Sequence, residues 1–269
     1  MQRPGTRQPW KKNWNSTRAG VLVPDEPEPP AIDWALDFRS PGNPGDTVAT
    51  DNSSYGVNFV KVGDVDIITP SPAAPSGTNV LHHPSGVAKY WAEPNGIGNL
   101  PLERPHLQCP GAFTFRTKMR WAPSFSLTTL LWGRMDVTNS DYGPNREWCL
   151  YTEAANSYVK LYNGRRGDFA NVYQFNLPSG NYLTQDEWID IEFSKDAVGA
   201  LRLFIRGIQS ATGPIDGTSI LFGNTDKSIV IGGWNYGAET ASNTYFDSFR
   251  LKDGEALHTA DFDPNDPSL

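Results

Sequence analysis

Hydrophobic and polar side chains alternate along residues 112–121, whose sequence is AFTFRTKMRW. One side of the alternation is mostly large and apolar, and consists of Phe113, Phe115, Thr117, Met119 and Trp121. The other side is mostly basic, and consists of Thr114, Arg116, Lys118 and Arg120. Successive side chains of an extended strand point to opposite faces. The pattern therefore predicts a half-buried strand with a cationic outer face.

Residues 188–193 (WIDIEF) and 201–206 (LRLFIR) show the same alternation on either side of a short connection, which predicts a β-hairpin. The positions expected to face the core are Ile189, Ile191, Phe193, Leu201, Leu203 and Ile205. This pairing sets Glu192 opposite, or one step diagonal from, Arg202, and brings Asp190 within reach of Arg206. The outward acids are therefore expected to meet these two bases.

Further short apolar or alternating segments, separated by Gly, Pro, Asn and Asp, extend along most of the chain. They cover residues 32–38, 55–68, 87–91, 127–132, 148–152, 158–162, 172–177, 228–231 and 244–251. At least ten short strands with turns between them predict an all-β fold, a two-sheet antiparallel sandwich over residues 31–269.

Composition agrees with this fold class and narrows the classes of function. The 25 Gly and 22 Pro in 269 residues disfavour a mainly helical protein, and 38% hydrophobic residues allow a sizeable core without disulfides. No stretch approaches the ~18 apolar residues of a membrane span, and the first residues lack the apolar core of a signal peptide. We therefore expect a soluble protein made in the cytoplasm, with no membrane partner.

The two cysteines, Cys109 and Cys149, are too few for a disulfide scaffold or a zinc site, and are expected to be buried thiols. The four histidines show no metal or triad spacing, so neither a metal nor a cofactor is expected.

The first thirty residues differ from the rest and predict an extended arm. Residues 1–20 contain five basic residues and no acid, whereas the net charge of the whole chain is −7. Residues 24–30 (PDEPEPP) are too rich in proline for a helix. The simplest interpretation is a disordered tail. The alternative is an arm that docks on a partner, with its tryptophans as anchors and its bases against an acidic surface.

Four segments in order resemble the laminin-G-like branch of the concanavalin A-like lectin/glucanase jelly rolls. They are 111–115 (GAFTF), 186–207 (DEWIDIEF through RG), 228–233 (SIVIGG) and 245–251 (YFDSFRL). The ending, residues 256–264, is similar to tails found on such domains in bacteriophage virion proteins. The resemblance covers residues 31–262, excludes residues 1–30, and implies a jelly-roll sandwich. These jelly rolls serve as lectins, glycosidases, adhesion modules and virion parts, so the fold alone does not choose the function.

An enzymatic reading rests on residues 189–193 (IDIEF), which resemble the family-16 glucanase signature EIDIEF. Those retaining enzymes use two glutamates four residues apart, which brings the carboxyl groups to about 5–5.5 Å. Trp188 occupies the position of the first glutamate, so the nucleophile is missing and Asp190 with Glu192 cannot complete the pair. We therefore expect no enzymatic activity and no catalytic residue.

A lectin reading rests on aromatic residues in or beside loops: Trp91, Trp132, Trp148, Trp234 and Tyr236. The candidate glycan site is Trp234, Asn235 and Tyr236. The alternative is that most tryptophans fill the core. A laminin-G-like calcium site would use Asp136, Asn139 and Asp141, which otherwise form an ordinary polar turn.

The third reading, which we adopt from the sequence, is a bacteriophage virion structural protein. It would be a capsid decoration or cement protein, or else a tail or fibre component, made in the host cytoplasm and located in the virion. Its arm would bind the major capsid protein or a tail protein, alongside other copies of itself, through Arg3, Arg7, Trp10, Lys11, Lys12, Trp14 and Arg18. Nucleic acid is disfavoured because the arm lacks dense basic runs. Glycan binding to host-surface polysaccharide is the alternative function.

Overall fold

The structure is a computed structural model that describes only part of the chain. The described residues are 14–16, 22–24, 32–84, 90–92, 107, 109–123, 129–135, 146–152, 157–163, 171–218, 228–232 and 243–265. The chain divides into two units, Met1–Ile32 with Pro267–Leu269 and Asp33–Asp266. The described part of the first unit includes an antiparallel hairpin of β1 (Trp14–Ser16) and β2 (Leu22–Pro24). The predicted boundary after residue 30 stays a prediction.

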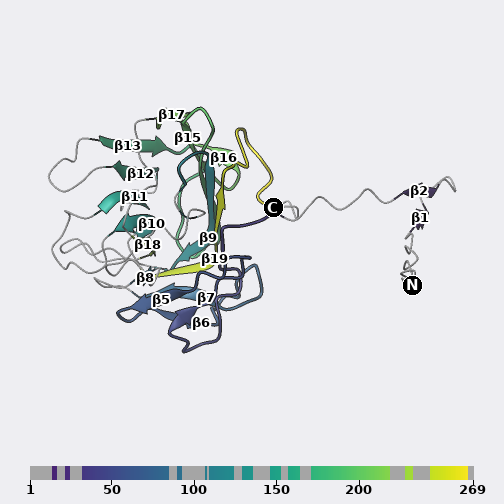
Figure 1. Ribbon diagram of the computed structural model, residues 1–269, viewed down its shortest axis with the longest axis vertical. Coiled ribbons are helices and arrows are strands. Elements are labelled where there is room, and N and C mark those ends of the chain that lie inside the picture. The colour runs from purple at the N-terminus through teal and green to yellow at the C-terminus, as the bar shows by residue number, and fades with distance from the viewer. Residues whose placement is uncertain are drawn as a thin grey trace, which may run out of the picture. The chain divides into compact units, whose positions relative to one another are not determined.

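The second unit is a sandwich of two antiparallel sheets (Figure 1). The eight-stranded sheet runs in the order β13 (Asn171–Asn176), β12 (Tyr158–Asn163), β11 (Arg146–Thr152), β10 (Thr129–Met135), β18 (Ser228–Ile231), β8 (Tyr90–Ala92), β5 (Phe59–Val62) and β4 (Val48–Ala49). The described residues include no α-helix. The predicted fold class, an all-β antiparallel sandwich, is confirmed.

The nine-stranded sheet forms the other layer. Its main order is β16 (Ile208–Gln209), β15 (Ala200–Ile205), β14 (Ile189–Lys195), β9 (Phe113–Trp121), β19 (Thr244–Asp253), β7 (Val80–His83) and β6 (Asp66–Ile68). Two short strands complete it, since β17 (Ile215–Asp216) pairs with β15 and β3 (Leu36–Asp37) pairs with β19.

The register of β19 against β9 contains a bulge that decides which side chains face outward. Phe246 pairs with Met119 and Ser248 pairs with Lys118, so Asp247 is one extra residue in β19. The Asp247 carboxylate accepts hydrogen bonds from the hydroxyl and the backbone N–H of Ser76. Burial raises the pKa of the Asp247 carboxyl.

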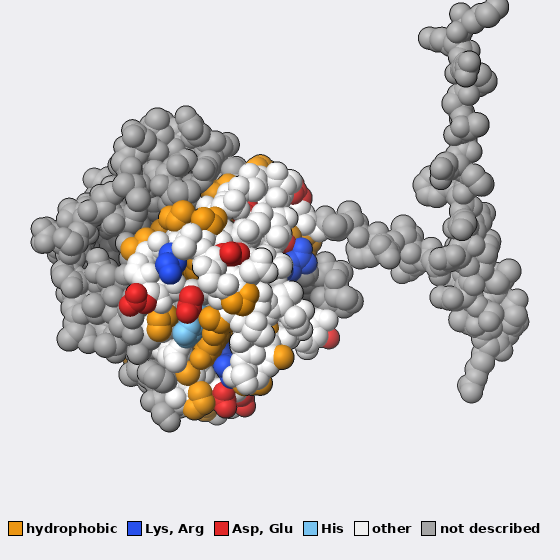
Figure 2. Space-filling view, turned by 90° about the horizontal axis from the view of Figure 1, so that it is seen from below, with side chains coloured by type: hydrophobic (Ala, Val, Ile, Leu, Met, Phe, Trp, Pro, Cys, Tyr) orange, Lys and Arg blue, Asp and Glu red, His pale blue; other side chains and the backbone are white. Residues whose placement is uncertain are grey.

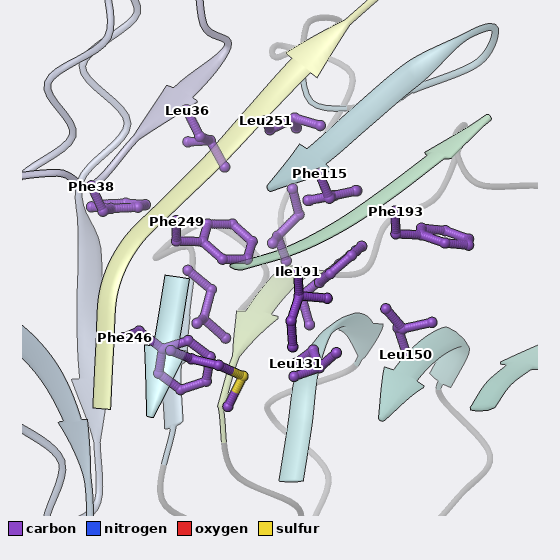
Figure 3. Packing of buried hydrophobic residues seen from close by; sticks show 14 of the residues in the cluster. Leu36, Phe38, Phe115, Leu131, Leu150, Ile191, Phe193, Phe246, Phe249 and Leu251 are labelled. Atoms are coloured by element: carbon purple, nitrogen blue, oxygen red, sulfur yellow. The ribbon is translucent and has the colours of Figure 1, made fainter. Parts of the chain in front are cut away.

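The core lies between the two sheets and is rich in aromatic rings (Figure 3). Trp132 from the eight-stranded sheet stacks on Phe115 from the nine-stranded sheet, with ring centroids 4.2 Å apart. The rings of Trp148, Phe193 and Phe249 surround Trp132 at 5.7–6.2 Å. The six hairpin positions predicted to face the core all belong to this cluster and are fully buried, which confirms the predicted hairpin.

Both cysteine thiols are buried, as the sequence predicts. Cys109 belongs to the main core, and burial raises the pKa of its thiol to about 12. Cys149 belongs to a second apolar cluster with Leu130, Tyr151 and Val230. Both faces of the eight-stranded sheet therefore contain buried apolar side chains.

Candidate binding site

The sites that the sequence proposes lie almost entirely outside the described residues. Of the arm, only Trp14 is described, as the first residue of β1; Arg3, Arg7, Trp10, Lys11, Lys12 and Arg18 are outside. Trp234, Asn235 and Tyr236 are outside too, as are Asp136, Asn139 and Asp141. These assignments stay predictions. Trp91, Trp132 and Trp148 are at most 1% exposed, so for these three the interpretation as core residues is confirmed and the interpretation as sugar contacts is wrong.

The acids of the hairpin do not meet the bases that the sequence assigns to them. In the observed register Glu192 is opposite Phe204, and Arg202 bonds Asp196 at 2.7 Å instead. Arg206 pairs with Glu187 at 3.0 Å. Asp190 pairs with Arg116 of the neighbouring strand β9 at 3.2 Å, because β9 flanks β14 on its other side. The predicted placement is confirmed, since Arg202 is one step diagonal from Glu192 and the Arg206 N–H donates to the Asp190 carbonyl, but the expected contacts between these side chains are wrong.

The segment after β19 covers these acids on the outer face of the nine-stranded sheet. His258 Nδ1 lies 2.9 Å from both carboxylate oxygens of the fully buried Glu192. Phe262 stacks on the His258 ring with centroids 3.5 Å apart, and its N–H donates to the Gly207 carbonyl. Arg116 Nη2 donates to the Pro264 carbonyl at 2.7 Å.

The basic side of β9 is correspondingly covered. Arg116 and Arg120 are each 2% exposed. These two side chains point to the outer side of the strand, as expected. The expectation that they form a cationic face is wrong, because they are buried. Alternation along one strand specifies only which side each residue faces, whereas the segment that covers that side lies far away in the sequence.

Burial raises the pKa of the Glu192 carboxyl above its ordinary 4.5, and the hydrogen bond with His258 opposes the shift. The folded protein therefore retains a proton that the unfolded chain releases, so this group makes the free energy of unfolding fall as pH rises from about 4.5 through the raised pKa. We expect Glu192→Gln to gain stability relative to the wild type across that window. Urea titrations at a series of pH values measure the difference.

The control for this experiment is Glu187→Gln. Glu187 is exposed, and its hydrogen bond from Thr184 is the main cause that lowers its carboxyl pKa. Glu187→Gln should therefore change the pH slope in the opposite direction and only slightly. A Glu192→Gln variant whose stability tracks the wild type at every pH would contradict the assigned role of the buried carboxyl.

A line of polar and aromatic side chains crosses the same outer face beyond the covered acids. Asp66 in β6 pairs with His82 in β7, His82 with Tyr245 in β19, and Tyr245 with Arg120 in β9. Trp188 directly precedes β14 and continues the line, with its ring 5.5 Å from the Arg120 guanidinium. We call these five residues, together with Asp186, which pairs with Arg120, the cross-strand row.

The side chains of the cross-strand row hold one another in place. His82 and Tyr245 stack nearly parallel with centroids 4.8 Å apart, and the Arg120 guanidinium lies 4.5 Å from the Tyr245 centroid. His82 Nδ1 is 2.7 Å from an Asp66 oxygen, and its Nε2 is 2.6 Å from Asn243 Oδ1. Arg120 donates to Asp186 at 2.9 Å. The result is a preorganised surface built on neighbouring strands.

Several groups of the row reach solvent. The side chain of Asp66 is 43% exposed and that of Asp186 is 53% exposed. Tyr245 and Trp188 are half-buried. The Tyr245 hydroxyl has no hydrogen-bond partner in the described part of the chain. The row can therefore offer carboxylates, a hydroxyl and a ring edge to a ligand.

Sequence reasoning did not find the cross-strand row. Asp66, His82 and Arg120 lie in separate segments with no motif spacing. The available signal was that Arg120 and Tyr245 fall on the polar side of their strands, but joining them required the strand order. Asp186 was noted only as part of the hairpin pattern, and Trp188 as the residue at the first glutamate position of the glucanase signature.

Among the described residues no helix is long and apolar enough to span a membrane. The same residues contain no group of three His, Cys, Asp or Glu side chains able to hold a metal ion.

Comparison with known proteins supports the fold at low sequence identity. No protein-family model and no curated protein sequence matches the chain. The receptor-binding domain of botulinum neurotoxin C/D mosaic serotype is 14% identical with a TM-score of 0.55, covering 86% of this chain and 48% of that one. Trypanosoma rangeli sialidase, in complex with a difluoro-KDN, is 16% identical with a TM-score of 0.54, covering 88% and 32%.

A third structure describes botulinum neurotoxin type C, whose cell entry depends on interaction with two ganglioside molecules. It is 12% identical with a TM-score of 0.52 and covers 85% of this chain and 48% of that one. The chain thus spans about half or less of the length of these proteins. These similarities establish a shared β-sandwich fold and leave the function to the site.

Proposed function

We propose that this chain is a non-enzymatic carbohydrate-binding module, and that the cross-strand row is its binding surface. The observation that carries the proposal is the set of half-buried rings and exposed carboxylates on neighbouring strands, with a Tyr245 hydroxyl that has no hydrogen-bond partner among the described residues. Sugars are bound by apolar ring contacts together with a few well-placed polar groups. The half-buried Trp188 ring supplies such an apolar contact, whereas its Nε1 is buried.

The burial of the acids on β14 supports a binding role without catalysis. A glycosidase needs two carboxyl groups that reach the sugar, one as acid and one as nucleophile or base. Asp190 is held by Arg116 and Glu192 by His258, and both carboxylates are at most 6% exposed. Trp188 belongs to the binding surface where the glucanase signature has its first glutamate.

The structural neighbours are consistent with this proposal. Among them are toxin domains that bind receptors, a toxin whose cell entry depends on gangliosides, and a sialidase in complex with a sugar acid. These are properties of those proteins, and the low identity transfers only the fold.

The test is binding of the full chain to a broad panel of neutral, sialylated and sulfated glycans, followed by titration calorimetry on the best ligand. We expect Trp188→Ala to weaken that binding by about fivefold or more, because the contacts of one aromatic ring contribute on the order of 1 kcal/mol. Tyr182→Ala is the matched control, since Tyr182 is an exposed aromatic at 38% outside the row.

Three outcomes separate the proposals. Loss of binding in Trp188→Ala but not in Tyr182→Ala supports the row. Loss in Trp234→Ala instead would keep the carbohydrate function and move the site to the loop that the sequence proposes. Absence of binding to every glycan class would overturn the carbohydrate function.

A role as a virion structural protein remains the second candidate, because the sequence favours it. The charge contrast between the basic residues 1–20 and the acidic chain as a whole suits an arm that docks on an acidic partner. If so, deletion of residues 1–20 should leave a folded sandwich that no longer joins the particle. Incorporation of the truncated chain at the wild-type level would contradict this role.

A further inference from the structure

We infer that the ligand of the cross-strand row is an uncharged oligosaccharide laid across the strands, an inference that rests on the proposed carbohydrate function. It names the chemical class of the ligand, for which the charges, the hydrogen-bonding groups and the length of the row each provide an argument.

The charge accessible at the row is negative. Asp66 at one end is 43% exposed and Asp186 at the other end is 53% exposed. The cation between them, Arg120, has a side chain only 3% exposed. Its two terminal nitrogens already donate to Asp186 and to the Ser71 carbonyl. A sugar carboxylate or sulfate would therefore approach two acids and find no accessible guanidinium.

The neighbouring cation does not reverse this balance. Lys118, two residues before Arg120 on the same side of β9, pairs in register with Asp190 and interacts with the Asp247 carboxylate. The surface in Figure 2 likewise shows basic and acidic side chains dispersed among polar and hydrophobic ones, without a broad patch of either sign. A surface of this kind does not attract a polyanion.

The hydrogen-bonding groups match neutral hydroxyls. Asp66 and Asp186 each use one carboxylate oxygen inside the row, which leaves the other oxygen to accept from a ligand. The Tyr245 hydroxyl both donates and accepts, and the Asn243 amide nitrogen has no partner among the described residues. Sugar hydroxyls are donors and acceptors at once, so they satisfy both kinds of group without bringing a charge.

The length of the row favours a chain of sugars over a single one. The row crosses β6, β7, β19 and β9 to the start of β14. These five strands are consecutive neighbours in the sheet. Neighbouring strands are about 4.8 Å apart, so five columns span about 19 Å, roughly three or four hexose units end to end.

The experiment compares two oligosaccharides of equal length by calorimetry with the full chain. One is a neutral linear hexose tetramer identified by the glycan panel, and the other is the same tetramer with its terminal unit oxidised to a uronic acid. We expect the neutral form to bind at least about fivefold more tightly. Two like charges about 4 Å apart in water repel each other by about 1 kcal/mol, which lowers the affinity of the acidic form by that factor. Its affinity should also be unchanged between about 0.05 and 0.5 M salt, because no charge pair is screened.

A charge variant tests the cause of the preference. Asp66→Asn removes one acid while keeping a group that can bond His82, so it should raise the ratio of acidic to neutral affinity by about threefold or more. Asp216→Asn is the control, because Asp216 is an exposed acid outside the row whose carboxylate accepts from Thr218. The control should leave the ratio unchanged.

The outcomes distinguish this inference from the function on which it rests. Tighter binding of the acidic tetramer, with loss in Trp188→Ala, would overturn the inference while the carbohydrate function stands. An affinity ratio in Asp66→Asn equal to that of Asp216→Asn would also overturn it. Absence of binding to both tetramers and to the whole glycan panel would instead remove the carbohydrate function itself.

Discussion

Trp132→Ala will lower the free energy of unfolding by about 3–5 kcal/mol. Trp132 is fully buried between the two sheets and contacts rings of both, including the stacked Phe115 at 4.2 Å. Truncation removes a large apolar side chain and leaves a cavity lined by rigid rings, which cannot close around it. Urea unfolding followed by circular dichroism measures the change.

Two controls bracket this result. Val198→Ala alters a side chain that is 80% exposed and should change stability by less than about 0.5 kcal/mol. Trp132→Phe keeps a ring in the centre and should cost less than the alanine variant. A Trp132→Ala protein as stable as Val198→Ala would mean that the two sheets do not pack through these rings.

Arg116→Met will destabilise the fold by about 3–5 kcal/mol and release the segment that follows β19. The substitution leaves the Asp190 carboxylate buried without its guanidinium, and it removes the hydrogen bond to the Pro264 carbonyl. Most of this loss in the free energy of unfolding comes from the Asp190 carboxylate, which stays buried without a compensating positive charge. Urea unfolding gives the stability, and hydrogen exchange at the Phe262 amide reports whether the segment has detached.

The matched control is Arg206→Met, because Arg206 also pairs with an acid but in a more exposed place. Its partner Glu187 is 60% exposed. An exposed pair contributes about 0–1 kcal/mol, so this variant should be nearly as stable as the wild type. Equal losses in the two variants, or an Arg116→Met protein whose Phe262 amide remains as protected as before, would contradict the buried network.

Much of the sandwich could be predicted from local alternation. Strand β9 was expected over residues 112–121 and is observed at Phe113–Trp121, and the hairpin faces are as expected. The expected segment 55–68 contains two strands, β5 and β6, which belong to different sheets. The chain passes between the sheets through Gly63, whose φ of +73° suits glycine. Periodicity reveals strands but does not assign them to sheets.

The candidate site could not be predicted in the same way. Its members come from five segments that meet only through the strand order β6–β7–β19–β9–β14. The covering of the outer face by residues 254–265 was likewise absent from any local pattern, although it explains why Arg116 and Glu192 are buried. Most of the residues that sequence analysis proposed for binding lie outside the described residues; the exceptions are Trp14 in β1 and the buried Trp91, Trp132 and Trp148.

The extra residue at Asp247 interrupts the alternation of β19 while the core side chains on both sides of it still face inward. Before it, Phe246 faces the core and Tyr245 faces outward, whereas after it the odd-numbered Phe249 and Leu251 face the core. Removing Asp247 would restore strict alternation and leave Tyr245, Phe246, Phe249 and Leu251 on their present faces. The core would be kept, and the strand would lose the carboxylate that accepts from Ser76. Relatives of this protein should therefore tolerate the loss of one residue at this point, provided that the residue facing Ser76 changes with it.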